Sequence, residues 1–391
     1  MGAQGGGGGE SDGQVLAAVP SKTVERASLN VARAGHTATL LPDGRVLVIG
    51  GESLLALNVG LEREPLDSVE IYDPVADLWT ELAPLPTPRN NHTATLLPDG
   101  LVLIVGGGRT NATGQPSGLE VQADALLYDP TTGASESLGP NVVARHGHLA
   151  AALPSGKVLI AAGAGDESEI QPGGNPQPFG NALASAELYD PATRTFEATG
   201  SLEQARYSFA SVTLADGRVL IAGGASAKKS GPVAHATAEV YDENTGIFEA
   251  AGAFDGPDRM FPGAARLEDG RVVVYGGIKP NVAFLDDAQV YDPTTNGWIR
   301  YEDVPPARTV SRIVPTLGGG AVIIGGYNCT PQSCDALRTA QNWSPVDGVA
   351  GELELERHRA LASATVFADG SILVVGGFRS NSLRQVELLY P

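Results

Sequence analysis

The sequence predicts an all-β, seven-bladed propeller with four antiparallel strands in each blade. Three observations predict it. A hairpin segment recurs seven times, an aromatic-rich strand follows each copy, and the chain ends one strand short of a complete seventh unit. The 50 glycines, 27 prolines and low share of charged residues (18%) favour short strands joined by tight turns.

The recurring hairpin is clearest in RAGHTATLLPDGRVLVIGG, residues 33–51, and in RNNHTATLLPDGLVLIVGG, residues 89–107. A Gly pair closes each copy and begins at 50, 106, 162, 223, 276, 325 and 376, with Ala at 162, so the repeat step is 49 to 61 residues. Two apolar runs flank Asp-Gly in five copies, Ser155-Gly156 in one and Gly318-Gly319 in another. These pairs predict a two-residue hairpin turn, because they tolerate positive φ.

The third and fourth strands of each unit follow the hairpin. The third strand is VEIYDP in the first unit and AELYDP in the third, and the fourth is WTELAPLP in the first. The last unit stops at VELLYP, so it lacks a fourth strand of its own. Residues 22–30, KTVERASLN, lie ten residues before the first hairpin, where a fourth strand belongs. We therefore expect an N-terminal strand to close the last blade and remove the exposed edges of an open ring.

These motifs resemble the kelch-repeat family over residues 22–391 and are similar to the bacterial, galactose-oxidase-central-domain-like repeats. The shared marks are the Gly pair, the Tyr-Asp-Pro and an aromatic shortly after it, at Trp79, Phe196, Phe248 and Trp298. The pattern departs at Ala162-Gly163 and at Trp343-Ser344-Pro345. The copper site of galactose oxidase needs a Tyr–Cys crosslink and two histidines. Because the only two cysteines share one short loop, we expect no copper site.

An arginine precedes every Gly pair by seventeen residues. The seven are Arg33, Arg89, Arg145, Arg206, Arg259, Arg308 and Arg359. The resemblance implies that this position opens the innermost strand, so the seven would ring one mouth of the central channel and could bind an anionic ligand. The alternative is structural: each arginine satisfies carbonyls and acids of its own or the adjacent blade. Candidate partners are Glu70, Glu187, Glu239 and Glu387, each two residues before a strand-three Tyr or its equivalent.

Metal ligands are the next candidates. His36, His92 and His148 each follow a repeat arginine by three residues, so they could bind zinc if they converged, or could hydrogen-bond between blades. Loop carboxylates could hold calcium but follow no dense ligand spacing, so we predict no metal and no cofactor. These loop carboxylates are Glu62, Glu64, Asp67, Asp166, Glu167, Glu169, Asp286 and Asp287. Cys329 and Cys334 would form a disulfide in an exported protein and be free thiols in a cytosolic one.

The connections between second and third strands are long and dissimilar, and the resemblance places them on one face with the fourth-to-first connections. We therefore predict a non-enzymatic binding module for a protein or glycan on that face. The alternative is a carbohydrate-active enzyme, such as a sugar mutarotase or an oxidase-like relative, that uses the arginine-lined mouth. No nucleophile elbow, P-loop or HExxH motif is present, so the sequence favours a protein without catalytic activity.

Charge and targeting signals set the remaining expectations. The formal net charge of −19 argues against nucleic acid as a partner. No run of 18 apolar residues exists, so no transmembrane helix is expected. Residues 1–21 are a Gly-rich flexible tether that resembles the segment after the lipidated cysteine of a mature bacterial lipoprotein, ahead of the propeller at 22–391. Together with the cysteine pair, the tether predicts an extracytoplasmic monomer, with a lipid anchor as one form of attachment.

Overall fold

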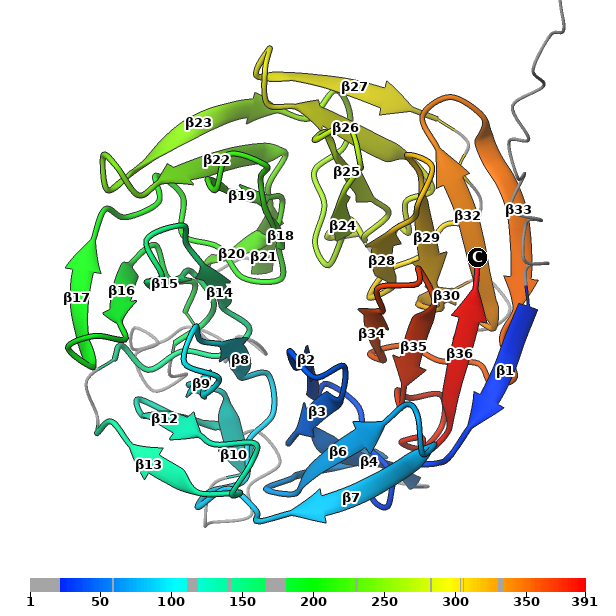
Figure 1. Cartoon of the computed structure of the whole chain (residues 1–391). Helices are drawn as coiled ribbons and strands as arrows, with labels where there is room; N and C mark the ends of the chain where they lie inside the picture. Colours follow the sequence, from blue (N-terminus) through cyan, green and yellow to red (C-terminus); the bar gives the residue numbers. More distant parts are fainter. Residues whose placement is uncertain are drawn as a thin grey trace, which may run out of the picture.

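The computed structural model confirms an all-β, seven-bladed propeller: seven four-stranded antiparallel sheets surround a common axis (Figure 1). The structure describes residues 22–57, 60–110, 119–139, 142–165, 181–228, 231–281, 283–302, 304, 306–329 and 334–391. The predicted tether, residues 1–21, lies outside the described residues. In six sheets the strands follow chain order from the axis outwards, and in the seventh the outermost strand comes from the N-terminal part of the chain.

The inner half of each blade consists of two short strands. The innermost strands are β2 (Thr37–Leu40), β8 (Thr93–Leu96), β14 (Leu149–Ala152), β18 (Ala210–Thr213), β24 (Gly263–Arg266), β28 (Arg312–Pro315) and β34 (Ser363–Val366). The second strands are β3 (Val46–Ile49), β9 (Val102–Val105), β15 (Val158–Ala161), β19 (Val219–Ala222), β25 (Val272–Tyr275), β29 (Ala321–Ile324) and β35 (Ile372–Val375). Every residue of the second strands is buried, since neighbouring blades cover both faces of each sheet.

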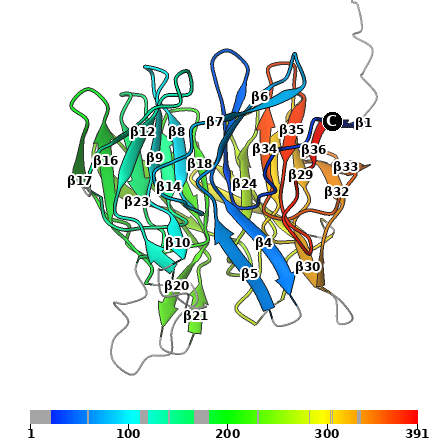
Figure 2. The ribbon, with the colours of Figure 1, turned by 90° about the horizontal axis from the view of Figure 1, so that it is seen from below.

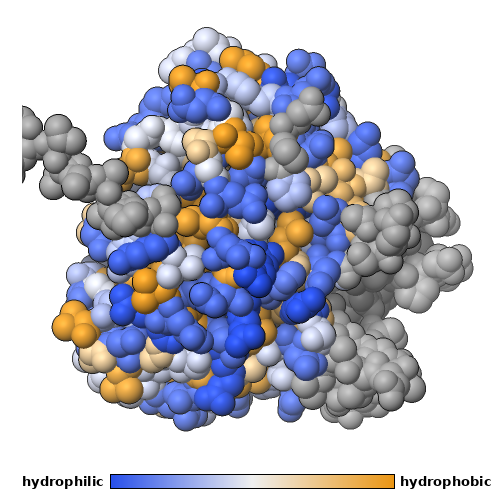
Figure 3. All heavy atoms as spheres, turned by 90° about the vertical axis from the view of Figure 1, so that its right-hand side faces the viewer, coloured by the Kyte–Doolittle hydropathy of each residue, from blue (hydrophilic) through white to orange (hydrophobic). Residues whose placement is uncertain are grey.

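The outer half of each blade carries the third and fourth strands. The third strands are β6 (Val69–Asp73), β12 (Ala125–Tyr128), β16 (Ala186–Asp190), β22 (Thr237–Asp242), β26 (Ala288–Asp292), β32 (Thr339–Ser344) and β36 (Val386–Tyr390). The outermost strands are β7 (Leu78–Leu82), β13 (Ser135–Ser137), β17 (Thr195–Thr199), β23 (Ile247–Ala253), β27 (Gly297–Tyr301), β33 (Gly348–Glu354) and β1 (Lys22–Arg26). The wall nearest β33 and β1 is mostly hydrophilic, with scattered apolar residues (Figure 3), as expected for a rim that faces water.

The turn between first and second strands differs from the two-residue turn that we predicted. In blade 1, Leu41 N–H donates to Arg45 O at 2.8 Å and Gly44 N–H donates to Leu41 O at 3.0 Å, which makes Pro42-Asp43-Gly44 a three-residue loop. Gly44 has a φ of 87°, whereas Asp43 is not among the residues with positive φ. The loop is therefore a type I turn followed by one left-handed residue, a geometry that accepts proline at its first position.

The predicted closure of the ring by an N-terminal strand is confirmed. β1 pairs antiparallel with β36, in a register that sets Lys22 opposite Tyr390 and Arg26 opposite Val386. The blue and red ends of the chain accordingly lie side by side in Figure 1. The segment after β1 is also tied to blade 1, because the Trp79 indole donates to Ala27 O at 2.8 Å. The seventh blade is thus completed by both ends of the propeller.

The hydrophobic core lies between adjacent blades. One cluster joins Leu47 and Ile49 of blade 1 to Val102 and Ile104 of blade 2, and similar clusters recur around the ring. Trp343 stands where five other blades have the strand-three tyrosine and is only 2% exposed, so this departure from the repeat keeps its packing role. Among the described residues, no helix is long and apolar enough to cross a membrane.

Four of the long connections between second and third strands continue as two-stranded ladders, which the sequence did not predict. They are β4 (Glu52–Leu57) with β5 (Gly60–Pro65), β10 (Gly108–Thr110) with β11 (Leu119–Val121), β20 (Ala225–Lys228) with β21 (Gly231–Ala234), and β30 (Tyr327–Cys329) with β31 (Cys334–Ala336). In Figure 2 strands of these ladders extend from the same end of the molecule. We call this end the loop face, and the end with the turns between first and second strands the turn face.

Candidate functional site

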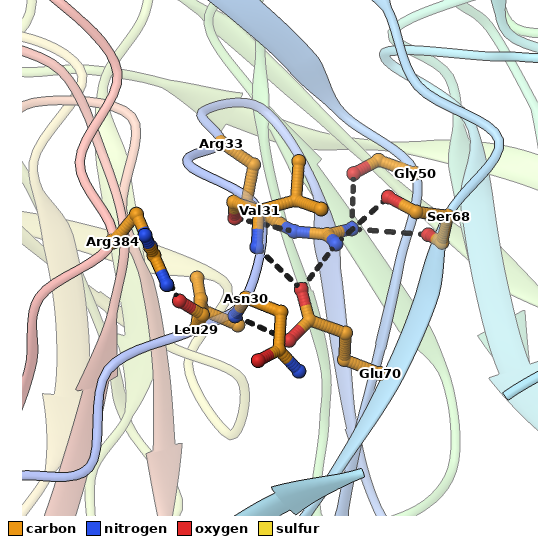
Figure 4. Close-up of polar contacts among 8 residues, drawn as sticks. All are labelled: Leu29, Asn30, Val31, Arg33, Gly50, Ser68, Glu70 and Arg384. Carbon is orange, nitrogen blue, oxygen red and sulfur yellow. Dashed lines mark hydrogen bonds and ion pairs between the residues drawn. The ribbon is translucent and has the colours of Figure 1, made fainter. Parts of the chain in front are cut away.

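The seven repeat arginines are the first candidate site residues, and all of them are buried. Six are 0% exposed and Arg359 is 1% exposed. In every blade one Nη1 donates to the carbonyl oxygen seventeen residues later, at 2.8 to 3.0 Å. In blade 1 this acceptor is Gly50, the first residue of the Gly pair (Figure 4). The fixed spacing of arginine and Gly pair is therefore one hydrogen bond repeated around the ring.

Carboxylates partner six of the seven guanidiniums. The ion pairs are Arg33–Glu70 (2.7 Å), Arg89–Asp124 (3.1 Å), Arg145–Glu187 (2.9 Å), Arg206–Glu239 (2.7 Å), Arg259–Asp287 (2.8 Å) and Arg359–Glu387. Arg308 instead donates to neutral oxygens, among them Thr339 Oγ1 at 3.2 Å and Gln341 Oε1 at 3.4 Å. The four glutamates named from the sequence are all among these partners. Burial lowers the pKa of Arg33, and the charge of Glu70 opposes that shift.

The four glutamates among these carboxylates also fix the connection that enters their blade. Glu70 accepts the backbone N–H groups of Asn30 at 2.7 Å and Val31 at 3.1 Å in addition to the Arg33 guanidinium (Figure 4). Glu239 and Glu387 accept backbone N–H groups in the equivalent connections. In these blades the arginine–glutamate pair thus fastens the fourth-to-first connection to the third strand.

The backbone of the arginines joins neighbouring blades. Gly51 N–H donates to Arg89 O at 3.0 Å, and the second residue of each other Gly pair donates in the same way to the arginine of the following blade. A Cβ added at Gly50 would lie 2.6 Å from Arg89 O, so a larger residue there would require this contact to shift. Ala162 stands at this position in blade 3 with the same left-handed backbone, φ 58°.

This geometry gives the repeat arginines a structural role, which was the alternative interpretation of the pattern. Their donors point inwards to carbonyls and carboxylates, and they do not line an open mouth with free guanidiniums. A ligand would have to break a buried ion pair to reach them, which is costly. The arginines therefore support the connections of the loop face, and those connections form the candidate site.

The three phased histidines also bridge blades. Each Nε2 lies near a hydroxyl of the preceding blade: His36 with Ser363 (2.9 Å), His92 with Thr37 (3.1 Å) and His148 with Thr93 (2.9 Å). They do not converge, and among the described residues no group of three or more His, Cys, Asp or Glu side chains could hold a metal ion. Of the loop carboxylates, Asp166, Glu167 and Glu169 lie outside the described residues, and Asp287 is engaged by Arg259.

The loop face carries the most varied features of the molecule. The β30–β31 ladder sets Cys329 opposite Cys334, and Cys329 is disulfide-bonded. Next to it Asp335 pairs with Arg379 of blade 7 at 2.7 Å, and both side chains are about half exposed (42% and 50%). The disulfide lies within the hairpin, and the ion pair ties that hairpin to the neighbouring blade.

Comparison with known proteins places these features in a family. The Kelch motif matches residues 32–86. Alpha-scruin of Limulus polyphemus is 28% identical over 225 residues, which cover 58% of this chain and 22% of scruin. Kelch-like protein 25 of Xenopus tropicalis is 25% identical over 321 residues, 81% of this chain and 48% of that protein. The chain therefore spans about a fifth of the first relative and about half of the second.

Solved structures share the architecture. The structure of YjhT superposes with a TM-score of 0.55 at 15% identity, covering 92% of this chain and 95% of that one. A fungal alcohol oxidase of the AA5 family, in complex with copper, superposes with a TM-score of 0.64 at 17% identity, covering 94% and 75%. This chain is a kelch-repeat propeller. At these identities the likeness to the oxidase extends to the fold alone.

The kelch propeller has further site features that sequence reasoning missed. Asp124 and Asp287 pair with repeat arginines although the position used for the prediction holds Leu126 and Gln289. In both blades the acid stands two residues earlier, which is a signal that could have found it. On the turn face, a pocket of about 420 Å³ is formed by the turns of blades 4 to 7, with the 79% exposed Leu317 at its edge.

The histidine bridges predict that the kelch propeller loses stability in mild acid. Burial lowers the pKa of His92 to about 3, and lowers the pKa values of His36 and His148 well below 6.5, with nearby arginines adding to each shift. Below pH 6.5 these three histidines stay neutral in the folded chain, whereas they bind protons in the unfolded chain. The stabilisation is thus complete above pH 6.5 and declines below it, by on the order of 1.4 kcal/mol per histidine per pH unit.

Urea unfolding at pH 7 and pH 5.5 measures this effect. We expect a fall of about 4 kcal/mol for the three histidines together, and a visibly smaller fall for His92→Gln, whose amide keeps a donor for Thr37. Equal stability at the two pH values would contradict the prediction.

Proposed function

We propose that this kelch propeller is a non-enzymatic binding module that takes a protein partner on its loop face, with a glycan as the second ligand class. The observation that carries the proposal is the difference between the two faces. Four ladder-paired hairpins extend from the loop face, whereas the turn face has only the short turns of the repeats (Figure 2). Connections displayed by a rigid scaffold are where binding residues concentrate.

The arginine network supports this proposal by making the loop face rigid. Four of the incoming connections are held by a glutamate, and each long connection leaves from a Gly pair, or its Ala-Gly equivalent, that is bonded to the next blade. Binding to pre-ordered loops loses little conformational entropy. The enzyme alternative would need free acid–base groups at the mouth, and the repeat arginines are bound to internal partners, so no observation favours a second function.

The experiment that tests the proposal compares two matched arginines. Arg379 pairs with Asp335 on the loop face at 2.7 Å, and Arg45 pairs with Asp43 on the turn face at 2.7 Å, and all four side chains are 37% to 50% exposed. Partners captured with the immobilised chain are identified, and their affinity is measured for Arg379→Ala and Arg45→Ala. We expect Arg379→Ala to weaken binding about tenfold and Arg45→Ala to change it less than about twofold.

A shortened hairpin gives a second variant for the same test. Replacing residues 227–232 with Asn-Gly keeps the pairs Ala225–Ala234 and Ser226–Val233 and removes the projecting part of β20–β21. We expect the shortened chain to fold and to bind the partner more weakly. Binding that is lost with Arg45→Ala and kept in both loop-face variants would contradict the proposal.

We further propose an extracytoplasmic location. The disulfide-bonded Cys329 supports it, since structural disulfides persist in oxidising compartments. Fractionation of the native source with an antibody to the propeller tests it, and recovery of the chain in the reduced cytosolic fraction would contradict it.

A further inference from the structure

One arginine breaks the pattern of the innermost strands. The fourth residue after each repeat arginine opens the innermost strand, and it is small, apolar or hydroxyl-bearing in six blades: Thr37, Thr93, Leu149, Ala210, Gly263 and Ser363. In blade 6 it is Arg312. None of the seven innermost strands contains Asp or Glu. Arg312 therefore brings a positive charge to the axis of the ring, on strands that carry no negative one.

The local geometry explains where the Arg312 side chain goes. In blades 7, 1 and 2 the hydroxyl at this position meets a histidine of the following blade, as Thr37 meets His92. After blade 6 the histidine position holds Ala362, so the space next to Arg312 is not filled by an imidazole. Arg312 Nε donates to Ala362 O at 2.6 Å. This bond engages Nε and leaves the two donors Nη1 and Nη2 outside it.

Arg312 is an exposed residue and has no counter-charge among the described residues. Its side chain is exposed, and Nη1 and Nη2 make no hydrogen bond or ion pair with any residue that the structure describes. Burial lowers its pKa with no carboxylate opposing the shift, in contrast to Arg33. Arg312 lies among packed strands and still has exposed surface, and the partly exposed residues of innermost β2 and β8 show that solvent reaches the axis.

The charges and donors around Arg312 indicate which kind of anion it would bind. Arg308, four residues earlier, is the repeat arginine that has no carboxylate partner among the described residues, so blade 6 holds two such guanidiniums in a chain of net charge −19. Only Arg312 of the two is accessible, because Arg308 is 0% exposed. A single accessible cation balances a monoanion, and a pair of Nη donors matches the two oxygens of a carboxylate.

We propose that Arg312 binds the carboxylate of a small organic acid in the axial space of the propeller, just inside the loop face. Nη1 and Nη2 each donate to one carboxylate oxygen, and the small and hydroxyl-bearing side chains of the innermost strands surround the rest of the ligand. The site is separate from the proposed partner surface, so it stands or falls independently of the proposed function.

The test uses sodium acetate as the probe, with sodium chloride at the same ionic strength as the reference. Acetate binding is followed by the line broadening of its carbon-13 carboxyl signal in the presence of the full chain. The variants are Arg312→Thr, which installs the residue of blades 1 and 2, and Arg312→Lys, which keeps the charge without the paired donors. Arg266→Thr is the control, because Arg266 is the other arginine of the innermost strands.

We expect saturable broadening with the wild-type chain and with Arg266→Thr, at least about tenfold weaker binding for Arg312→Thr, and intermediate binding for Arg312→Lys. Acetate should also raise the Tm of the wild-type chain and leave that of Arg312→Thr unchanged. In chloride alone, Arg312→Thr should be at least as stable as wild type, because it removes an unpaired charge. Equal acetate binding by Arg312→Thr, no saturable binding by wild type, or a large loss of Tm for Arg312→Thr in chloride would overturn the proposal.

Discussion

Replacing Glu70 with alanine should lower the free energy of unfolding by about 3–5 kcal/mol. Glu70 and Arg33 are both 0% exposed and 2.7 Å apart, so the substitution leaves a guanidinium buried without its counter-charge. It also removes the acceptor of the Asn30 and Val31 N–H groups (Figure 4). These two residues belong to the connection that leads from the closing strand into blade 1. The cost therefore combines a lost ion pair with two partly buried donors that lose their acceptor.

Equilibrium unfolding in guanidinium chloride measures the change, and Asp43→Ala is its matched control. Asp43 accepts the same kind of bond from Arg45 at 2.7 Å, but the two side chains are 50% and 37% exposed. An exposed pair contributes about 0–1 kcal/mol. If Glu70→Ala were as mild as Asp43→Ala, the arginine network would not be the internal support that we infer.

Removing residues 1–30 should be at least as damaging, with a cost on the order of 5 kcal/mol or more. The deletion takes away the five ladder pairs between β1 and β36 and the fully buried Leu29. Five backbone hydrogen bonds at about 1 kcal/mol and one buried leucine at about 2 kcal/mol give this magnitude. It also uncovers the edge of β36, and an unpaired edge strand promotes association.

Thermal unfolding and size-exclusion chromatography test the closure. We expect the shortened chain to lose its cooperative transition and to elute as aggregates, and a peptide of residues 22–30 added in excess to restore part of the transition. A chain that begins at Lys22 is the control and should melt as the whole chain does. A shortened chain that stays monomeric with an unchanged Tm would show that the N-terminal strand does not hold the ring closed.

The sequence predicted the blade number, the strand order and the closing strand, because these follow from phased hairpins and from the place where the last unit stops. It predicted the wrong turn, since Asp43-Gly44 was considered without Pro42, which begins the three-residue loop. It did not predict ladders such as β4–β5. The pairing of those segments has no counterpart in the repeat, so the periodic signal that located the blades could not locate them.

For the site, the sequence located the arginines but left two roles open. The sequence shows that Arg33 precedes Gly50 by seventeen residues, but it does not show which way the guanidinium points. The structure shows that the guanidinium is buried and bonded to Gly50 O, which favours the structural role. Comparison with a consensus also concealed Arg312, because a residue that differs within a short strand resembles ordinary variation. Its meaning emerges only when Ala362 is seen next to it and no acid is found on the innermost strands.

The most direct test of the central claim, that the loop face binds the partner, is hydrogen–deuterium exchange of the kelch propeller with and without its captured protein partner. The account predicts slower exchange in β4–β5, β20–β21 and β30–β31, with the turns between first and second strands unchanged. Slower exchange confined to those turns, around Asp43-Gly44 and Leu317, would show that the partner binds the turn face and would contradict the account.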